Sequence, residues 1–245
     1  MRRRLDAELV RRGLATSRRE AQELVEAGRV RVAGAPALKL TRLVSLEEPL
    51  FVEGPPKLFV SRGGEKLAGA LEKFGIDVGG AKVIDVGAST GGFTDCLLQR
   101  GAAHVVALDV GHGQLHPKLR DDPRVTVVER MNVRHANMAE FGAPFDLVVA
   151  DLSFISLTMV AEPLLAAAGL EGQLVLLVKP QFEAGKVDVA RGRGIITDPE
   201  LHARACNDVA RALADRGGIV VAQMESPIRG AQGNVEFLVH VRVSR

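Results

Sequence analysis

From residue 61 onward, short apolar runs alternate with segments long enough to form helices. The runs are rich in valine and lie at residues 83–87, 104–110, 125–128, 146–151, 173–179, 218–223 and 236–243. Helix-length segments such as FTDCLLQRG and LHARACNDVARALADRG separate most of them. This alternation predicts an α/β domain with a doubly wound parallel sheet of seven strands. Only a loop separates the last two runs, which predicts that the seventh strand is antiparallel.

The N-terminal segment has a different pattern. Apolar residues at helical spacing predict a first helix within residues 5–13, and Ser17 with Glu20 forms the capping-box signature of a second helix. Gly28 is placed to end that helix. Residues 29–38, RVRVAGAPAL, then alternate like a strand with a turn. The pattern predicts a small module of two helices and strands.

The stretch LEEPLFVEGPPKLFV, residues 46–60, reads as the connection between the two modules. Its prolines and glycine cannot continue a helix or a central strand. We therefore place a small domain at residues 1–56, a linker at 57–60 and a large domain at 61–245.

The charge is distributed unevenly. The chain of 245 residues has a formal net charge of +2, but residues 1–60 carry +4 and the remainder −2. Arginines supply most of the positive charge in the small domain: Arg2, Arg3, Arg4, Arg11, Arg12, Arg18 and Arg19. So small a core cannot bury all seven, which predicts an exposed basic surface that meets a polyanion, with a merely solvated helical face as the alternative.

The remaining composition excludes several classes of protein. The two cysteines, Cys96 and Cys206, have no metal-binding spacing, and no metal is expected. The basic N-terminus lacks the apolar segment of a secretory signal. Charged residues and a proline interrupt the apolar run 160–178, so it cannot span a membrane. We expect a cytoplasmic protein.

The stretch VIDVGASTGGFTD, residues 83–95, predicts a strand, a glycine-rich turn and a helix, an arrangement that commonly holds a nucleotide-like ligand. It is not a dinucleotide fingerprint, because Ser89 stands where a second glycine must approach a pyrophosphate. It is not a phosphate-binding loop of the Gly-Lys-Ser/Thr type, and no lysine or arginine lies between residues 83 and 99. The loop therefore offers no side-chain cation to a phosphate.

The acidic residues around this turn favour a cationic ligand. Asp85 ends the first strand, Asp109 ends the second at the spacing of a ribose-binding carboxylate, and Asn132 follows the third, where an amide could edge an adenine. This combination favours S-adenosylmethionine, with NAD or a ligand-free turn as alternatives. The expected cofactor-binding residues are Asp85, Gly87, Ala88, Ser89, Gly91, Gly92, Phe93, Asp109 and Asn132.

Four charged residues stand at strand ends or at the start of the large domain. Lys66 lies in SRGGEKL, Asp151 closes the fourth strand, Lys179 the fifth, and Glu236 opens the last. Ligands of open α/β sheets sit at the carboxyl ends of the strands, so Asp151 and Lys179 are expected near the site. A structural ion pair is the alternative for either residue.

The motifs SRGGEKL, DVGASTGGFTD, ADLSF, VKPQFE and GNVEF follow one another in the order found in the TlyA family, and the N-terminal module resembles the S4 RNA-binding domain. The resemblance covers nearly the whole chain. It implies a class I (Rossmann-like) methyltransferase domain similar to the FtsJ/RrmJ enzymes. It also implies a 2′-O-methyltransferase of cytidine in 16S or 23S ribosomal RNA that uses S-adenosylmethionine, with ribosomal RNA or ribosomal subunits, not DNA or membranes, as partners. The catalytic tetrad of that family corresponds to Lys66, Asp151, Lys179 and Glu236.

The resemblance also places residues expected to contact RNA. Arg4, Arg18 and Lys39 lie at S4-like positions for phosphate contacts, and Phe154 is a candidate to stack on a flipped cytosine or, alternatively, to pack in the core. The family's Arg-x-Trp-Val linker motif is KLFV here, with Lys57 and Phe59 in the places of arginine and tryptophan.

Lys179 follows a fully apolar strand, so we expect it to be better desolvated than Lys66 and to act as the base. Three other functions remain open at this point: a non-catalytic RNA-binding assembly factor, a pseudouridine synthase with an S4 domain, and a membrane-lytic toxin. The glycine-rich loop and the complete tetrad favour the methyltransferase.

Overall fold

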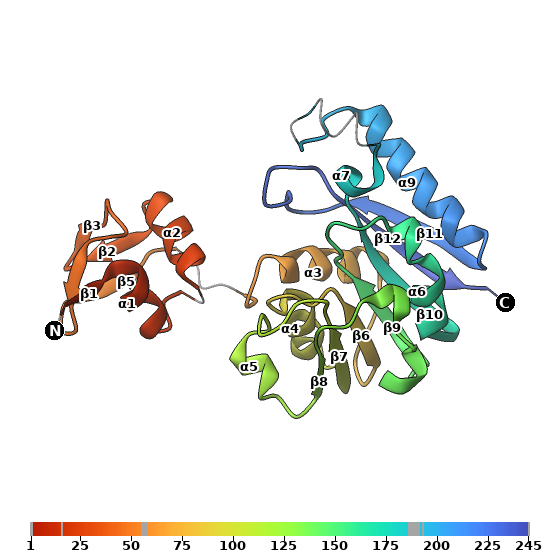
Figure 1. Ribbon diagram of the computed structural model, residues 1–245, viewed down its shortest axis with the longest axis horizontal. Helices are drawn as coiled ribbons and strands as arrows, with labels where there is room; N and C mark the ends of the chain where they lie inside the picture. Colours follow the sequence, from red (N-terminus) through yellow and green to blue (C-terminus); the bar gives the residue numbers. More distant parts are fainter. Residues whose placement is uncertain (1, 16, 55–57, 186–191, 193, 245) are drawn as a thin grey trace. The chain divides into compact units, whose positions relative to one another are not determined.

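The structure is a computed structural model, and it describes residues 2–15, 17–54, 58–185, 192 and 194–244 (Figure 1). The chain divides into two compact units, Met1–Lys57 and Leu58–Arg245, each with its own apolar core. Each unit is described by itself.

The small unit packs two helices against short strands. Its helices are α1 (Leu5–Arg11) and α2 (Arg18–Glu26). Its strands are β1 (Arg2–Arg4), β2 (Val30–Val32), β3 (Ala35–Pro36), β4 (Leu43–Ser45) and β5 (Leu50–Val52). The strands pair in the orders β3-β2-β5 and β1-β4. The Ser17 hydroxyl accepts a hydrogen bond from the Glu20 backbone N–H at 3.2 Å, so this residue caps α2 as predicted.

One part of the predicted connection belongs to this small unit. Strand β5 lies inside the stretch 46–60 and pairs antiparallel with β2, in the register Arg31 opposite Phe51. The sequence pattern did not predict this strand, because it has only three residues and directly follows Pro49.

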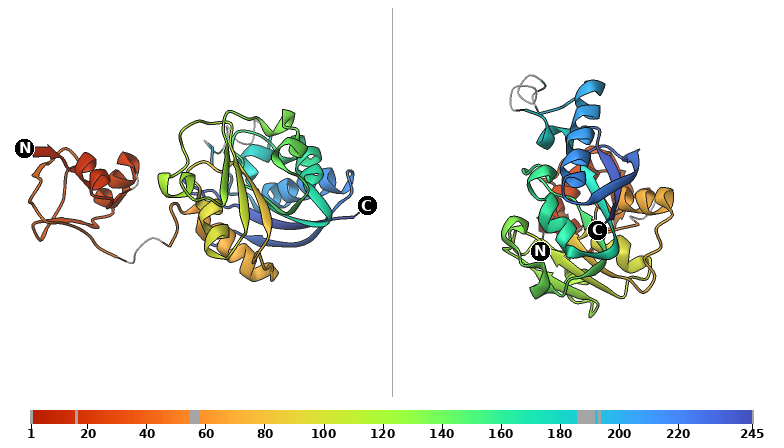
Figure 2. Two further views of the ribbon diagram at one scale, coloured as in Figure 1. Left: turned by 90° about the horizontal axis from the view of Figure 1, so that it is seen from below. Right: turned by 90° about the vertical axis from the view of Figure 1, so that its right-hand side faces the viewer.

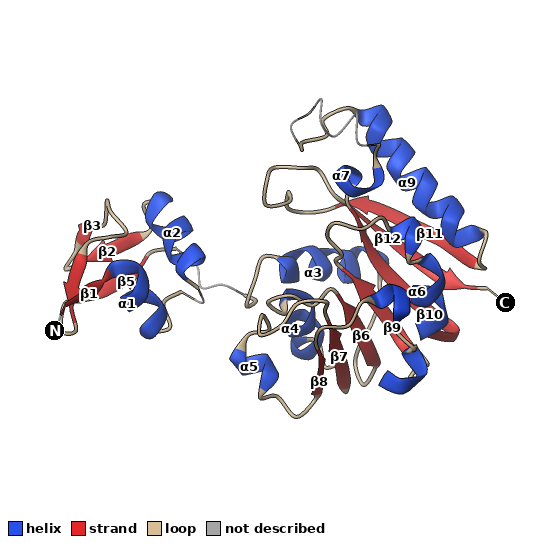
Figure 3. Cartoon of the chain, in the orientation of Figure 1, coloured by secondary structure: helices blue, strands red, loops and turns tan. Residues whose placement is uncertain are grey.

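The large unit is a seven-stranded sheet with helices on both faces, as the sequence predicted (Figure 3). Its helices and 3₁₀ turns are α3 (Gly63–Phe74), α4 (Gly92–Gln99), α5 (Pro117–Arg120), η1 (Val133–His135), η2 (Met138–Phe141), η3 (Leu157–Met159), α6 (Ala161–Ala167), α7 (Pro180–Glu183) and α9 (Pro199–Ala214). Its strands are β6 (Lys82–Val86), β7 (His104–Leu108), β8 (Val125–Val128), β9 (Phe145–Ala150), β10 (Ala168–Val178), β11 (Gly218–Glu225) and β12 (Phe237–Val243).

The strand order is β11-β12-β10-β9-β6-β7-β8. Strands β10, β9, β6, β7 and β8 are parallel to one another, whereas β12 is antiparallel to both of its neighbours. The prediction of an antiparallel seventh strand is confirmed. The carboxyl ends of the parallel strands and the start of β12 therefore meet at one edge of the sheet.

Two apolar layers enclose this sheet. The helices on the two sides of the sheet are visible in Figure 2. One layer contains residues of α6 and α9, including Leu164 and Val209, and the other contains residues of α3 and α4, including Leu67 and Leu97. The central strands are buried on both sides, which explains their nearly continuous valine and leucine runs. In the part of the chain that the structure describes, no helix is long and apolar enough to cross a bilayer.

Candidate functional site

A cavity of about 1190 Å³ opens at the carboxyl edge of the sheet. Its wall combines the loops that follow β6, β7, β8 and β9 with α7. Of the residues singled out in the sequence, those that line it are Gly87, Ser89, Asp109, Asn132, Asp151 and Phe154. This is the position where ligands bind in open α/β sheets.

The glycine loop has an unusual backbone conformation that explains its sequence. Gly87 and Ser89 have φ angles of +86° and +47°. The Ser89 backbone N–H donates to Asp109 Oδ2 at 2.8 Å, and the Gly111 N–H donates to Asp109 Oδ1 at 2.6 Å. Asp109 thus fixes the loops after β6 and β7 against each other where they face the cavity.

The other predicted loop residues do not line this cavity. A Cβ atom on Gly91 would lie 2.2 Å from the Leu119 side chain, and one on Gly92 would lie 2.3 Å from Ser61 Oγ. These glycines therefore allow α5 and the segment before α3 to pack closely against α4. Ala88 and Phe93 are buried in the core under α3 and α4.

Asp85 lies at the end of β6 beneath the cavity, and its side chain is fully buried. Thr94 Oγ1 donates to its Oδ2 at 2.6 Å, whereas Oδ1 has no hydrogen-bond partner among the described residues. Burial, together with the nearby charges of Asp151 and Asp109, raises the pKa of Asp85 to about 7. The carboxylates at the ends of β6, β7 and β9 therefore form one acidic group.

Asn132 follows β8 and begins the 3₁₀ turn η1. Its side-chain oxygen accepts the backbone N–H of Arg134 at 3.0 Å, which orients the amide at the cavity wall.

The four tetrad residues form two lysine–carboxylate pairs. Lys179 Nζ lies 2.6 Å from Asp151 Oδ1 and donates to Ser153 Oγ at 3.0 Å. Lys66 Nζ donates to Glu236 Oε2 at 2.5 Å. The sequence placed Asp151 and Lys179 near the site by topology and the family resemblance added Lys66 and Glu236; the structure brings all four to one edge of the sheet.

The sheet register explains how residues so distant in sequence meet. Val178 lies opposite Phe237 in the antiparallel pair β10–β12, so the next two residues, Lys179 and Glu236, lie opposite each other beyond the strand ends. In the parallel pair β9–β10, Leu176 is in register with Ala150, which brings Asp151 to the same edge. Helix α3 adds Lys66, which reaches Glu236 from one turn beyond Gly63.

The expected difference in burial between the two lysines is wrong. Lys66 and Lys179 are each 8% exposed. The start of α3 is not an open segment, because Gly64 allows Phe59 to pack against it and Gly92 allows α4 to do so. The two lysines differ in their distance from the cavity instead. Asp151 and Ser153, which bind Lys179, line the cavity, whereas Glu236, which binds Lys66, does not.

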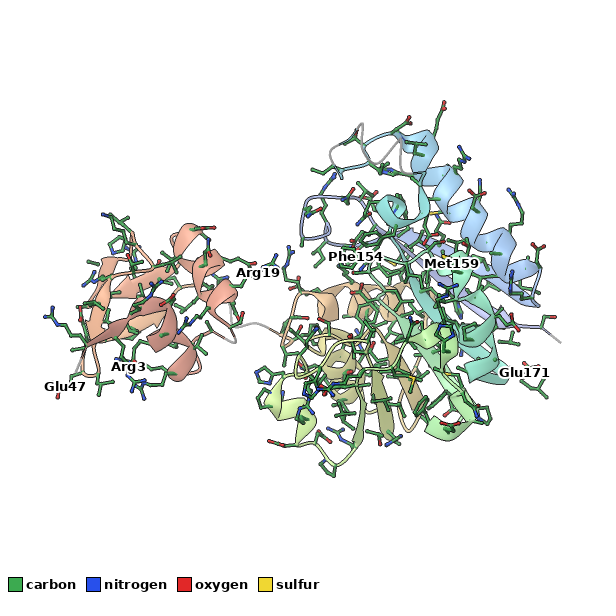
Figure 4. All side chains as sticks on the ribbon, in the orientation of Figure 1. Arg3, Arg19, Glu47, Phe154, Met159 and Glu171 are labelled. Carbon is green, nitrogen blue, oxygen red and sulfur yellow. The ribbon has the colours of Figure 1, made fainter. Side chains whose placement is uncertain are left out.

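Phe154 is an exposed aromatic side chain and not a core residue. It is 92% exposed, and its φ of +64° is rare for a residue with a side chain (Figure 4). Its ring centroid lies 5.3 Å from that of Phe182 in α7, and both rings line the cavity. The core alternative for Phe154 is therefore excluded.

The sequence reasoning missed four residues of the site: Thr94, Ser153, Gln181 and Phe182. Each lies within or next to a motif already identified, in GGFTD, ADLSF or VKPQFE. Only their contacts in three dimensions show that Ser153 binds Lys179 and that Thr94 binds Asp85.

The segment before α3 is joined to the glycine-loop helix. The Val60 N–H donates to Asp95 Oδ2 at 2.8 Å, and Gln99 Nε2 donates to the Leu58 carbonyl at 2.8 Å. The Phe59 ring packs against Gly64. Lys57 lies outside the described residues.

In the small unit, the arginines fall into two groups. Six of the seven arginines predicted to form a basic surface are exposed, and Figure 4 labels Arg3 and Arg19; the six are Arg2, Arg3, Arg4, Arg11, Arg18 and Arg19. Arg12 is not part of that surface, because its guanidinium binds Glu8 and the backbone carbonyls of Ser45, Leu46 and Glu48. Arg11 also pairs with Glu8.

Glu8 shows the effect of this network, since hydrogen bonds from Arg11 and Arg12 lower its pKa to about 2. The predicted RNA-contacting residues Arg4, Arg18 and Lys39 are all exposed, although Arg4 also pairs with Asp6 at 2.9 Å.

Comparisons with known proteins match the small unit and the large unit to two different families. Residues 3–48 match the S4 domain, and residues 59–243 match the FtsJ-like methyltransferase family. Over 240 residues the chain is 52% identical to the 16S/23S rRNA (cytidine-2′-O)-methyltransferase TlyA of Mycobacterium tuberculosis, covering 98% of this chain and 89% of that protein.

Two further relatives extend this likeness. Hemolysin A of Brachyspira hyodysenteriae is 42% identical over 97% of this chain and 98% of its own length. A candidate hemolysin of known structure from Streptococcus thermophilus superposes with a TM-score of 0.79 at 39% identity, over 99% of this chain and 89% of that one. The chain belongs to the TlyA family of FtsJ-like methyltransferases that carry an S4 domain.

Proposed function

We propose that this protein transfers a methyl group from S-adenosylmethionine to the ribose 2′-hydroxyl of cytidine in ribosomal RNA. The observation that carries the proposal is the Lys179–Asp151 ion pair at the wall of a cavity that the glycine loop also lines. The named activity of the 52% identical relative supports it.

The cavity suits the proposed cofactor. Asp85, Asp109 and Asp151 surround the glycine loop with negative charge, which favours a cationic ligand and disfavours a pyrophosphate. The buried Oδ1 of Asp85 lacks a partner among the described residues, and a cationic amino group nearby would stabilise this carboxylate. Asp109 and Asn132, at the ends of β7 and β8, would hold the ribose and the adenine.

Bound S-adenosylmethionine would supply a methyl group on a sulfonium centre. The chain must then orient a ribose hydroxyl for in-line attack and remove its proton. We assign the proton to Lys179 Nζ, whose partners Asp151 and Ser153 line the cavity. Lys179 would act in its neutral form, after its ion-pair proton has passed to solvent. The hydroxyl proton would then pass to this amine as the methyl group moves from the sulfonium to the ribose oxygen, leaving the demethylated cofactor.

Lys66 and Glu236 act as a second pair beside the first. Because both are buried and bound to each other, they provide a fixed arrangement of charge. Their role is to position Lys179 and the ribose.

The RNA would be held at two places. Phe154 offers an exposed ring for stacking on the flipped base, and base–aromatic stacking contributes about 1–3 kcal/mol per base. In the small unit, Arg4, Arg18 and Lys39 would contact phosphates and supply affinity that depends on salt concentration.

Two measurements test the proposal. Calorimetry should show binding of S-adenosylmethionine or its demethylated product and no binding of NADH. Mass-spectrometric mapping of ribosomal RNA incubated with the protein and S-adenosylmethionine should show new 2′-O-methylcytidine. Tight NADH binding would contradict the cofactor assignment, and methylation on a base or on another nucleoside would contradict the reaction.

A further inference from the structure

Gln181 lines the same cavity, and its buried side-chain oxygen lacks a partner among the described residues. It is the second residue of α7 and lies two positions after Lys179. Within the part of the chain that the structure describes, its Oε1 accepts no hydrogen bond and is shielded from solvent. Burying an unsatisfied acceptor costs free energy, so such groups in folded proteins call for an explanation.

The charged side chains on either side of Gln181 have partners. Lys179 pairs with Asp151, and Glu183 accepts hydrogen bonds from Ser156 Oγ at 2.5 Å and from the Leu157 N–H at 2.8 Å. The unsatisfied oxygen is therefore a property of Gln181, not of a loosely packed segment. An unpartnered acceptor at a cavity wall is suited to accept a hydrogen bond from a ligand that carries a donor group.

The place of Gln181 in the fold indicates which ligand. Asp109 and Asn132 follow β7 and β8, whereas α7 follows β10, on the other side of β6 in the order β10-β9-β6-β7-β8. Gln181 thus lies on the half of the cavity that holds Asp151 and the rings of Phe154 and Phe182. This is the side where the proposed function places the target nucleotide.

We infer that Gln181 selects the target base, and this inference rests on the proposed function. A base that stacks on Phe154 presents its polar edge to the residues around that ring. Cytosine carries an amino donor at position 4, where uracil carries a carbonyl acceptor. The Oε1 oxygen of Gln181 accepts a hydrogen bond from the cytosine amino group and meets a second acceptor in uracil, so this orientation of the amide favours cytidine. The Nε2 donor could bind uracil only if the amide turned over, and a Gln181→Glu side chain, which offers acceptors only, distinguishes the two.

The test compares two ribosomal RNA substrates that differ only at the nucleotide methylated by the wild-type protein, one with cytidine and one with uridine. The full-length protein and S-adenosylmethionine are used, and single-turnover rates are measured. Gln181→Leu should lower the rate on cytidine roughly tenfold and leave the rate on uridine unchanged or higher. The affinity for S-adenosylmethionine should stay the same.

Two variants control the experiment. Gln181→Glu keeps an acceptor and should keep the preference for cytidine, which a merely structural role would not predict. Gln223→Leu, at an exposed position of β11, should leave both rates unchanged.

An unchanged cytidine-to-uridine ratio in Gln181→Leu would overturn the inference. A loss of S-adenosylmethionine affinity that equals the loss of rate would also overturn it, because the residue would then serve the cofactor. If the wild-type protein methylates neither RNA, the proposed function itself fails.

Discussion

The positive side chains that we propose to contact RNA in the small unit differ from the two tetrad lysines of the large unit. In the small unit, Arg4, Arg18 and Lys39 face solvent. In the large unit, Lys66 and Lys179 are buried, and each has a carboxylate within 2.6 Å. An exposed cation attracts phosphates over a distance but is screened by salt, whereas a buried pair is screened little and has one fixed geometry.

This difference predicts a division of labour. Losing one exposed arginine removes one of several similar contacts, so affinity should fall by a modest factor. Losing one member of a buried pair leaves its partner as an uncompensated charge beside the cavity, so the rate of reaction should fall by orders of magnitude.

The largest expected effect is that of Lys179. Lys179→Ala removes the proposed base and should lower the single-turnover rate of methyl transfer roughly 10³-fold, within the range for lost acid–base catalysis. RNA and S-adenosylmethionine should still bind. Lys73→Ala, at an exposed position of α3, is the control and should retain the wild-type rate. A Lys179→Ala variant with near-normal activity would show that the proton leaves by another route.

Gly87→Val should have the next largest effect, on cofactor affinity and stability together. The backbone at Gly87 has φ +86°, and an added Cβ would lie 2.8 Å from the Asp151 carbonyl oxygen and 3.1 Å from the Leu152 side chain. The substitution therefore disturbs the segment that carries Asp151, as well as the loop.

The backbone strain in Gly87→Val alone should cost about 1–3 kcal/mol. Gly80→Val is the control. It introduces the same kind of backbone strain, because Gly80 has φ +72°, but no steric crowding, because nothing lies within 4 Å of an added Cβ. Thermal unfolding and calorimetry of both variants test this. Equal S-adenosylmethionine affinity in the two variants would show that the space around Gly87 is unimportant.

Asp85→Asn should change how stability depends on pH in the protein without cofactor. Burial raises the pKa of Asp85 from 3.8 to about 7, so the folded state holds its proton more tightly than the unfolded chain. The stabilisation that this bound proton provides is therefore lost as pH rises from about 4 to about 7. The free energy of unfolding falls by about 1.4 kcal/mol for each unit by which the pKa of Asp85 is higher in the folded than in the unfolded state.

Asparagine does not titrate, so Asp85→Asn should be more stable than the wild type at pH 8 by a larger margin than at pH 5. Denaturant unfolding at the two pH values measures this margin. Asp215→Asn, at an exposed site, is the control. A margin that does not change with pH would contradict the assignment.

The smallest expected effect is that of Arg18. Arg18→Ala should weaken RNA binding severalfold and reduce its salt dependence by roughly one counterion. Binding of S-adenosylmethionine should not change. Arg204→Ala, an exposed arginine of α9, provides the comparison in the other unit. RNA affinity that stays unchanged at moderate salt would mean that this basic face is only solvated.

The sequence predicted the architecture well because long periodic segments determine it. The apolar runs of β6, β7, β9, β10 and β12 are buried on both faces, and burial leaves a clear pattern in sequence. Strand β5 was missed because three residues after a proline leave no such pattern.

The site was harder to predict than the fold. Strand ends located Asp151 and Lys179, since topology alone brings these ends together, and the family motifs located Lys66 and Glu236. The burial of Lys66, the exposure of Phe154 and the contacts of Arg12 with three backbone carbonyls depend on packing between distant segments. Short-range sequence patterns do not contain that information.

The most direct test of the division of labour compares Arg18→Ala and Lys179→Arg at saturating protein and S-adenosylmethionine. Single-turnover formation of 2′-O-methylcytidine is measured on one ribosomal RNA substrate. Arg18→Ala should reach the wild-type rate once binding is saturated, whereas Lys179→Arg should stay inactive, because a guanidinium keeps its proton at any working pH. An active Lys179→Arg variant, or an Arg18→Ala variant that remains slow at saturation, would contradict the account.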